Sequence, residues 1–436
     1  MWDGTMTEPL EVSAARERDE QVRGPTWVEV DLDAVERNVR RVRAWVGRAV
    51  GVFAVVKADA YGLGALPVAR AALAGGASGL AVARVSEGRA LRAAGIEAKI
   101  LVLTGVPTEE LAEAVEAELA LSLADRAPLP ALRVAAYRAG KRAVVHLALD
   151  TGLTRYGGDP NEIEALAEAI ASDPAIRLDG LYTHFASADE TDGFLEEQLA
   201  RFHRVRLRLE RLGHVIPHYH AANTAATLRT PAAHLDLVRL GIGLYGAGVG
   251  AADPAAPRLE LAVQLRARVL RVMEVSEGTT VGYGRTFRCP GPTRLALVGA
   301  GFADGVPRAL SNRGVVLIGG QRAPLVGRVS MDQCVADVTA LGAVEPGDEA
   351  VFYGVQGNTS LSPDEVAQAA DTNVHELFCR IGARVPRIYR RQARPDSLST
   401  GHEASAAPWS WDRLPRVVAE PLERPLSARV EAELAS

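Results

Sequence analysis

The sequence contains few cysteines and no long apolar segment. Its three cysteines, Cys289, Cys334 and Cys379, lie far apart in 436 residues and show no metal-ligand spacing. An odd number of scattered thiols is typical of a reducing compartment, so we expect a cytoplasmic protein without a metal site. There is no run of about eighteen apolar residues, so we expect no membrane-spanning helix. Residues 1–24 are polar and charged without an apolar centre, which argues against a secretory signal.

An excess of one charge is also lacking. The chain has 49 Lys and Arg against 54 Asp and Glu, which gives a net charge of −5, and the two signs are interspersed. No basic stripe of the kind that binds a phosphate backbone is present, so nucleic acid is not an expected partner. The hydrophobic share of 48% and the charged share of 24% are ordinary for a globular protein. The length predicts two or three domains.

Short β-branched runs alternate with Ala-, Leu- and Arg-rich helical stretches from about Val52 to Gly246. Eight such runs are present: Val52–Lys57, Gly79–Arg84, Lys99–Thr104, Leu119–Ala124, Ala143–Asp150, Leu178–Phe185, Ile216–His220 and Leu235–Leu240. Alternation of this kind predicts parallel strands joined by helices, and eight repeats are the count of a (β/α)8 barrel. An open doubly wound sheet is the alternative. No glycine-rich dinucleotide fingerprint follows the first run, where residues 57–61 read KADAY.

The pattern changes after about Ala252 to strand-like runs separated by Gly- and Pro-containing turns. These runs are Leu261–Val275, Arg294–Gly299, Gly314–Ile318, Gln321–Val326 and Glu349–Tyr353, followed by helical pieces at Pro363–Ala370 and Val374–Cys379. We therefore expect four parts: a flexible extension (1–25), an α/β barrel domain (26–255), a mainly-β domain (256–392) and an appended, mostly disordered tail (393–436). The tail is rich in Pro, Ser and Glu and has no core pattern.

Polar and ionisable residues follow five of the predicted barrel strands. They are Lys57 and Tyr61 after the first run, Asp150, Arg155 and Tyr156 after the fifth, His184 and Asp189 after the sixth, Asn223 and Thr224 after the seventh, and Arg239, Gly241, Ile242 and Tyr245 at the eighth. Each alone has a structural explanation, such as an ion pair or a buried histidine with a hydrogen-bond partner. Because the carboxyl ends of barrel strands form one rim, their coincidence at five ends indicates an active site.

A lysine at such a rim can lose its proton through desolvation and neighbouring cations. It can then bind an aldehyde covalently, as the lysines that hold pyridoxal 5′-phosphate do. The backbone N–H groups of Gly241 and Ile242 and the Thr224 hydroxyl are suitable phosphate donors at a helix start. The ring of His184 could pack on the cofactor. These residue types together favour a pyridoxal-phosphate site.

At this point the sequence resembles a known family. The segment AVVKADAYGLG (54–64) is similar to the cofactor-lysine motif of alanine racemases, and the resemblance continues through LDTGLTRYG, THFASAD, RLGIGLYG, VGYGRTF, GFADGVPR, GRVSMDQ and IGARVPR. It runs in order from about Thr26 to Arg390. The family combines a pyridoxal-phosphate-binding barrel with a C-terminal β domain, and Trp27–Leu32 would be the strand that joins that domain. The implied reaction is interconversion of L-alanine and D-alanine, which supplies peptidoglycan synthesis.

The resemblance also implies roles for individual residues. Lys57 would hold the cofactor and act as the base on one face of the substrate, and Tyr283 of a second subunit would act on the other face. Arg155 would contact the ring oxygen and the substrate carboxylate, and Arg239 the pyridine nitrogen. The remaining contacts would be Tyr61, Thr224, Gly241 and Ile242 to the phosphate, His184 and Asn223 to the cofactor, and Met331 and Asp332 to the substrate from the partner. A homodimer follows from this arrangement.

Elementary chemistry agrees with this scheme. Racemisation removes a proton from one face of Cα and returns one to the other, which two opposed bases accomplish. Tyr283 has an ordinary pKa of about 10 and needs nearby cations to act as a base. Arg239 stays protonated, so the pyridine nitrogen facing it would not be. Decarboxylases of the related barrel family usually place a glutamate there, which makes that alternative weaker.

Three positions depart from the family pattern. Ala148 stands where many members carry a carbamylated lysine that orients the arginine, Phe302 replaces a tyrosine of the entry passage, and Ala383 replaces a tyrosine that touches the phosphate. They leave open a racemase of broader amino-acid range. A cofactor-binding protein with little turnover is a further alternative, against which the presence of both Lys57 and Tyr283 argues.

Overall fold

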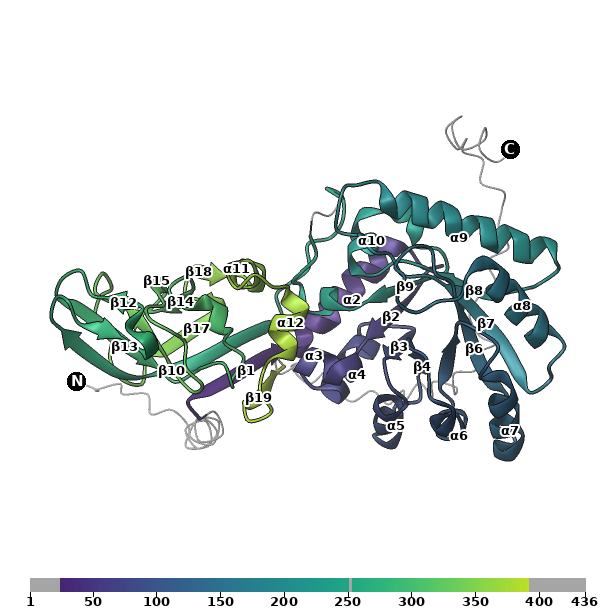
Figure 1. Cartoon of the computed structure of the whole chain (residues 1–436), viewed down its shortest axis with the longest axis horizontal. Coiled ribbons are helices and arrows are strands. Elements are labelled where there is room, and N and C mark those ends of the chain that lie inside the picture. The colour runs from purple at the N-terminus through teal and green to yellow at the C-terminus, as the bar shows by residue number, and fades with distance from the viewer. Residues whose placement is uncertain (1–23, 251–252, 392–436) are drawn as a thin grey trace, which may run out of the picture.

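Eight short parallel strands form a closed barrel in the N-terminal part of the computed structural model, which describes residues 24–250 and 253–391 (Figure 1). The strands are β2 (Gly51–Val55), β3 (Gly79–Val82), β4 (Lys99–Val102), β5 (Ala120–Leu123), β6 (Ala143–Ala148), β7 (Ile176–Tyr182), β8 (His218–His220) and β9 (Leu237–Leu240). Every residue of β2 to β5 is buried. Parallel strands covered on both faces require such continuous apolar runs.

Helices surround the barrel, and some of them begin at a residue whose side chain accepts from a helix N–H. They are α2 (Leu32–Val46), α3 (Lys57–Gly62), α4 (Ala65–Ala74), α5 (Val85–Ala93), α6 (Leu111–Glu116), α7 (Leu129–Ala139), α8 (Pro160–Ala171), α9 (Phe194–Arg211) and α10 (Thr224–Arg229). The Asp159 carboxylate accepts from Asn161 N–H at 2.7 Å and Glu162 N–H at 3.0 Å, and Pro160 occupies the first helical position. Both features satisfy or avoid unpaired N–H groups at the start of α8.

The C-terminal domain is built on the long strand β10 (Val263–Val275), which pairs with β1 (Thr26–Asp31), β13 (Thr293–Val298) and β17 (Glu349–Gln356). The other strands are β11 (Thr280–Val281), β12 (Phe287–Arg288), β14 (Val315–Ile318), β15 (Gln321–Pro324), β16 (Cys334–Asp337), β18 (Thr359–Leu361) and β19 (Arg387–Arg390), and the helices are α11 (Pro363–Ala369) and α12 (Val374–Cys379). Because β1 precedes the barrel in the chain, the β sheet contains both ends of the described fold.

The two domains meet at the turn that follows β2. Strand β1 runs antiparallel to β10 and parallel to β19, and β19 carries Arg387 and Tyr389. Arg387 Nε donates to Gly62 O over 2.9 Å, and Tyr389 Oη donates to Leu63 O over 3.2 Å. The β domain therefore contacts the segment immediately after Lys57.

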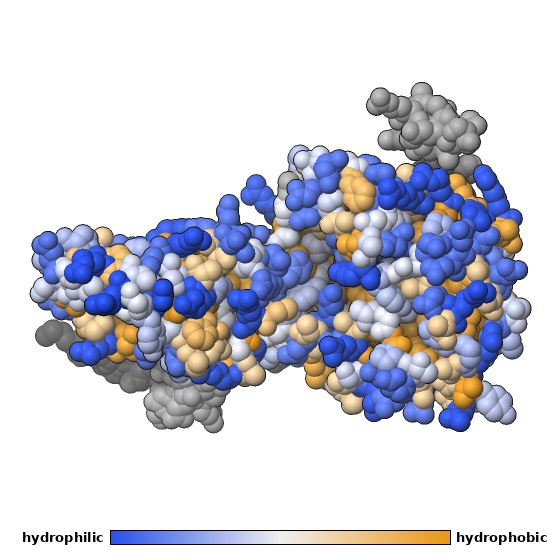
Figure 2. All heavy atoms as spheres, viewed as in Figure 1, coloured by the Kyte–Doolittle hydropathy of each residue, from blue (hydrophilic) through white to orange (hydrophobic). Residues whose placement is uncertain are grey.

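The predicted fold class, a (β/α)8 barrel followed by a mainly-β domain, is confirmed. Several predicted strand ends were too late in the chain: the first barrel strand ends at Val55 and not at Lys57, and β7 ends at Tyr182 and not at Phe185. Sequence reasoning missed the short strands β11, β12, β16, β18 and β19. The expected tail (393–436) lies outside the described residues, as does nearly all of the expected flexible extension (1–25). Figure 2 shows charged and apolar residues interspersed over both domains on this face. Among the described helices, none is long and apolar enough to cross a membrane.

Candidate active site

Lys57 lies just beyond the first barrel strand and begins α3, which is a left-handed turn and not a regular helix. Its four successors, 58–61, have φ between 52° and 60° and ψ between 37° and 50°. They read Ala-Asp-Ala-Tyr, without a glycine. A non-glycine residue in this region costs roughly 1–2 kcal/mol. The contacts around the turn must therefore offset this strain.

Side chains within and outside the turn stabilise it. Tyr245 Oη donates to Ala60 O over 2.7 Å, and the Asp59 carboxylate accepts from Ala65 N–H at 2.7 Å. The ring of Tyr61 is buried edge-on to that of Tyr245, with centroids 6.0 Å apart. These contacts fix the position of the turn, and with it the backbone of the lysine that precedes it.

Lys57 is half-buried among positively charged groups. Burial lowers its pKa below the ordinary lysine value, and the guanidinium groups of Arg155 and Arg239 lower it further, while Glu87 and Cys379 act in the opposite direction. A lysine with a lowered pKa is more often present as the free amine near neutral pH. Such an amine can act as a nucleophile or as a base.

Arg239 extends from β9 into the buried interior of the barrel, where it is 3% exposed. Its Nη1 lies 2.9 Å from His220 Nδ1, and its Nη2 donates to Thr183 O and Ala221 O, both at 2.9 Å. Burial lowers the pKa of Arg239 to about 10, so it remains protonated at neutral pH. Since a guanidinium only donates, any group that completes this site opposite Arg239 must accept a hydrogen bond.

His184 lies beside Arg239, with its Nδ1 3.2 Å from Arg239 Nη2. Burial, followed by the charges of Arg239 and Arg155, lowers the pKa of His184 to about 3. The imidazole is therefore neutral near pH 7. A neutral, flat ring at this position suits contact with an aromatic ligand, as the sequence suggested.

The segment after β9 packs closely against Thr224 and Tyr61. The N–H groups of Gly241 and Gly243 donate to Thr224 Oγ1 at 3.1 and 3.3 Å. A Cβ atom at Gly241 would collide with the Tyr61 hydroxyl, so a larger residue here would displace that side chain. Burial raises the pKa of Tyr61, which keeps this hydroxyl protonated and able to donate.

Two other predicted cofactor residues adjoin this segment. Asn223 is the N-cap of α10, and its Oδ1 accepts from Ala226 N–H at 3.0 Å. Ile242 begins a buried turn of 3-10 helix (Ile242–Tyr245) directly after Gly241. In this structure the Asn223 side chain organises the helix start that presents Thr224.

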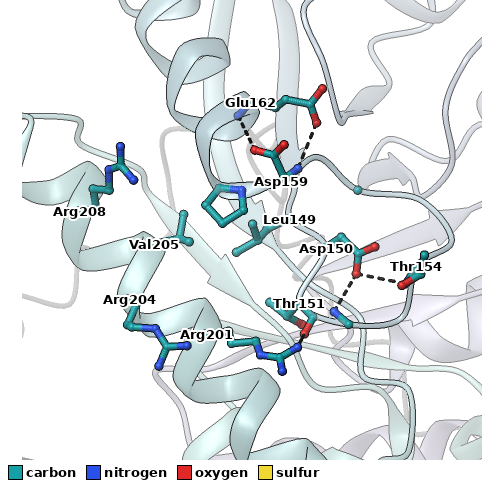
Figure 3. Close-up of a pocket in the computed structure, with 13 residues that line it drawn as sticks. Leu149, Asp150, Thr151, Thr154, Asp159, Glu162, Arg201, Arg204, Val205 and Arg208 are labelled. Carbon is teal, nitrogen blue, oxygen red and sulfur yellow. Dashed lines mark hydrogen bonds between the residues drawn. The ribbon is translucent and has the colours of Figure 1, made fainter. Parts of the chain in front are cut away.

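Arg155 is exposed at the end of a segment organised by one carboxylate. Asp150 Oδ1 accepts from the N–H groups of Gly152 and Thr154 at 2.8 and 3.2 Å (Figure 3). It also accepts from Leu153 N–H at 3.0 Å. Three amides converging on one oxygen define the path of this segment. The position of Arg155 therefore depends on Asp150.

Helix α9 also forms hydrogen bonds to the segment between Asp150 and Arg155. Arg201 Nη1 donates to Thr151 O over 2.8 Å, and Gln198 Nε2 donates to Thr151 Oγ1 over 3.1 Å. A cavity of about 770 Å³ lies between this segment and α9 (Figure 3). Neither Lys57 nor Arg239 lines it. The cavity is therefore separate from the site built around Lys57.

Tyr283 lies on the surface of the β domain, between β11 and β12, where its side chain is 74% exposed. Figure 1 places β12 at the end of the molecule remote from the barrel. Met331 is 55% exposed on the same domain, and Asp332 Oδ1 accepts from Arg384 Nη2 at 2.6 Å. Within one chain, the structure therefore does not bring Tyr283 to Lys57.

The three departures from the family pattern occupy different environments. Ala148 is the last residue of β6 and is 1% exposed, so no charged group takes the place of the carbamylated lysine there. Phe302 is 43% exposed, and Ala383 is also on the surface. The hydrogen bonds of Asp150 and Arg201 supply local support to the Arg155 segment in the absence of a lysine at 148.

Sequence reasoning missed two residues that surround Arg239. Tyr182 stacks on His220 with ring centroids 4.9 Å apart and planes at 12°, and the Arg239 guanidinium lies 5.4 Å from the Tyr182 centroid. Tyr182 Oη also donates to Ser122 Oγ over 2.9 Å. The sequence feature that could have identified them is their position, because Tyr182 and His220 are polar residues at the ends of the barrel strands β7 and β8.

Comparison with known proteins assigns both halves of the chain to one family. Residues 30–248 match the model described as alanine racemase, N-terminal domain, and residues 262–389 match alanine racemase, C-terminal domain. An alanine racemase of Desulforamulus reducens is 42% identical over 369 residues, covering 84% of this chain and 99% of that protein.

Solved structures agree with this assignment. The alanine racemase of Streptomyces coelicolor A3(2) is 39% identical with a TM-score of 0.79, and the match covers 86% of this chain and 100% of that one. The Bacillus anthracis alanine racemase with bound L-Ala-P is 34% identical with a TM-score of 0.77, over 85% of this chain and 96% of that one. The chain therefore belongs to the alanine racemase family.

Proposed function

We propose that the chain interconverts L-alanine and D-alanine, with Lys57 and Tyr283 as bases on opposite faces of the substrate. The observation that carries this proposal is a half-buried lysine at the barrel rim whose pKa is lowered by burial and by Arg155 and Arg239. Such an amine can accept the Cα proton from one face in one direction of the reaction, and in the other direction its protonated form donates a proton to that face. The likeness to alanine racemases gives no support to a broader substrate range.

The cofactor that fits this site is pyridoxal 5′-phosphate. When bound, it supplies an aldehyde that joins covalently to Lys57 and an electron-withdrawing ring that acidifies the substrate Cα–H. The Tyr61 and Thr224 hydroxyls and the close backbone approach at Gly241 suit a phosphate. The neutral ring of His184 suits the aromatic part. We therefore assign these four residues, with Asn223 and Ile242, to cofactor binding.

Arg239 would face the ring nitrogen. Its guanidinium is buried and protonated and carries only donors, so a ring nitrogen opposite it would accept a hydrogen bond and stay unprotonated. An unprotonated ring withdraws less charge from the substrate carbon. Side reactions that need strong withdrawal are thereby suppressed, as a racemase requires.

The second base would come from a second copy of the chain. Tyr283 is exposed and lies between β11 and β12, and β12 is at the end of the molecule remote from the barrel (Figure 1). A two-fold dimer, the commonest closed symmetry, would place the β domain of each copy at the barrel rim of the other. Met331 and Asp332 of that second copy would then line the substrate site, and Arg155 would bind the substrate carboxylate.

A chiral chromatography assay tests the reaction. The purified chain with added pyridoxal phosphate is incubated separately with each of a panel of L-amino acids. We expect D-alanine from L-alanine and no D-product from the other substrates. Several D-products would replace this proposal with a broad racemase, and Phe302 would be the first residue to substitute. Absence of any D-product with the cofactor bound would refute the racemase function.

A further inference from the structure

Glu87 connects the Lys57 turn to the loop after the neighbouring barrel strand. It is half-buried in the first turn of α5, and one carboxylate oxygen accepts from Ala58 N–H at 2.6 Å. The other oxygen accepts from Ala83 N–H at 2.8 Å and Arg84 N–H at 3.0 Å. One carboxylate thus binds three backbone amides from two βα loops.

The hydrogen bond to Ala58 N–H fixes the backbone next to Lys57. It belongs to the first residue of the left-handed turn and follows Lys57 directly in the chain. The turn contains no glycine, so its backbone geometry depends on outside contacts. Tyr245 and Asp59 act on the middle of the turn, whereas Glu87 acts at its start.

Both oxygens of Glu87 are needed as acceptors. A glutamine at this position would keep one carbonyl oxygen, but its NH2 group would face at least one of the three backbone N–H groups. A donor facing a donor leaves that hydrogen bond unmade. The site therefore discriminates between a carboxylate and its amide of the same shape.

Glu87 also contributes negative charge next to Lys57. The other charged or titratable groups acting on Lys57 or shifted by it come from several elements: Arg155 after β6, His184 after β7, Arg239 on β9, and His375 and Cys379 on α12. The two arginines lower the pKa of Lys57, and Glu87 raises it. Glu87 thus moderates the effect of the arginines.

We propose that Glu87 is a positioning residue for Lys57, which fixes the start of the left-handed turn and balances the positive charge of Arg155 and Arg239. The proposal rests on the function proposed for Lys57 as cofactor lysine and base. It assigns Glu87 no contact with substrate or cofactor. Its effects should therefore appear in the backbone of the turn and in the basicity of the lysine.

Hydrogen exchange of the full-length, cofactor-loaded chain tests the first effect. In Glu87→Gln, we expect amides in the peptide covering residues 56–64 to exchange about three- to tenfold faster than in the wild type, as expected for the loss of one hydrogen bond. Glu109→Gln removes the same charge from an exposed position and should leave this peptide unchanged. Equal protection in wild type and Glu87→Gln would overturn the positioning role.

Competitive acetylation of the full-length chain after cofactor removal tests the second effect. The sequence has only three lysines, Lys57, Lys99 and Lys141, so the exposed Lys141 is an internal reference. We expect the labelling midpoint of Lys57 to move to lower pH in Glu87→Gln, because a charge that favours the ammonium form is gone. Glu87→Asp keeps the charge and should shift the labelling midpoint of Lys57 less than Glu87→Gln does. No shift in Glu87→Gln would refute the electrostatic part.

Hydrogen exchange and lysine labelling can both be measured whether or not the chain has racemase activity. If the wild-type chain forms no D-alanine, the function proposed for Lys57 fails, but exchange and labelling still report whether Glu87 holds the turn. If D-alanine forms and neither measurement responds to Glu87→Gln, only the role of Glu87 is refuted.

Discussion

Arg239 Nη1 lies 2.9 Å from His220 Nδ1 inside the barrel, and this contact determines the protonation of the imidazole. The guanidinium must donate, so Nδ1 accepts and the ring proton of His220 resides on Nε2. That atom lies 2.9 Å from His146 Nδ1, to which it donates. Burial, and next the charge of Arg239, hold the pKa of His220 well below its ordinary value. The imidazole is thus a neutral acceptor for Arg239.

Replacing His220 should therefore disturb both stability and the cofactor environment. In His220→Leu, Arg239 Nη1 loses its acceptor, which we expect to cost about 1–3 kcal/mol in the free energy of unfolding. The absorption spectrum of bound cofactor should change and kcat should fall, because Arg239 keeps its bonds to Thr183 O and Ala221 O but loses the acceptor that orients Nη1. Urea unfolding, spectroscopy and steady-state kinetics measure these effects.

His234 provides the matched control. It is also buried, and its Nε2 lies 2.8 Å from Thr227 O. His234→Leu should destabilise the chain to a similar degree while leaving the cofactor spectrum unchanged. Indistinguishable spectra for the two variants would contradict the role given to His220.

Buried neutral histidines should make the fold sensitive to acid. The folded-state pKa values of His184 and His220 lie below the ordinary value, that of His184 at about 3. Below an unfolded-state pKa of about 6.5, unfolding therefore takes up protons, so the free energy of unfolding falls as the pH drops. For His184 this window extends from about pH 6.5 to about pH 3, and each such histidine contributes about 1.4 kcal/mol per pH unit within its window.

Urea titrations between about pH 7 and pH 5 check this slope. His220→Leu should show a smaller slope than the wild type, because one fewer proton is taken up on unfolding. A wild-type stability that does not change across this interval would show that these imidazoles are not kept neutral in the folded state.

The sequence was most informative where a local pattern decides the structure. The barrel strands are buried apolar runs separated by amphipathic helices, and their number could be read directly. The left-handed turn at 58–61 could not be predicted from the sequence. It contains no glycine, and contacts with distant segments stabilise its backbone conformation. The strand Cys334–Asp337 was missed because its pairing with β13 is a long-range property.

The candidate site was predictable to a similar extent. Strand ends identified Lys57, Arg155 and Arg239, which the structure brings close enough to influence one another electrostatically. The acceptors of Arg239 were predicted only in part: strand ends placed His184 at the same rim, but His220 was not identified. The role of Tyr283 follows only from family resemblance and stays a prediction.

Subunit mixing tests whether Tyr283 acts across an interface. Lys57→Ala should lose covalent cofactor attachment, and Tyr283→Phe should impair proton exchange on one face, so each homodimer should be nearly inactive. In a mixed dimer, one site carries both substitutions and the other carries neither. After random subunit exchange in a 1:1 mixture, we expect about a quarter of wild-type activity. Failure to recover activity despite exchange, verified by native mass spectrometry, would contradict a shared site.

Asp150 should control the position of Arg155. In Asp150→Ala, the N–H groups at 152–154 lose their common acceptor, so the segment should no longer present Arg155 in one place. We expect KM for alanine to rise about tenfold or more, the effect of losing a charge-assisted contact to the substrate carboxylate.

Asp159→Ala is the control for this change. Asp159 caps α8 through two amides in the same connection but lies beyond Arg155. Its loss should cost about 1 kcal/mol of stability, as for other N-caps, with little change in KM. Steady-state kinetics and urea unfolding of both variants separate the two effects. If KM rises equally in both, loosening of the whole connection is responsible, and Asp150 has no specific role in placing Arg155.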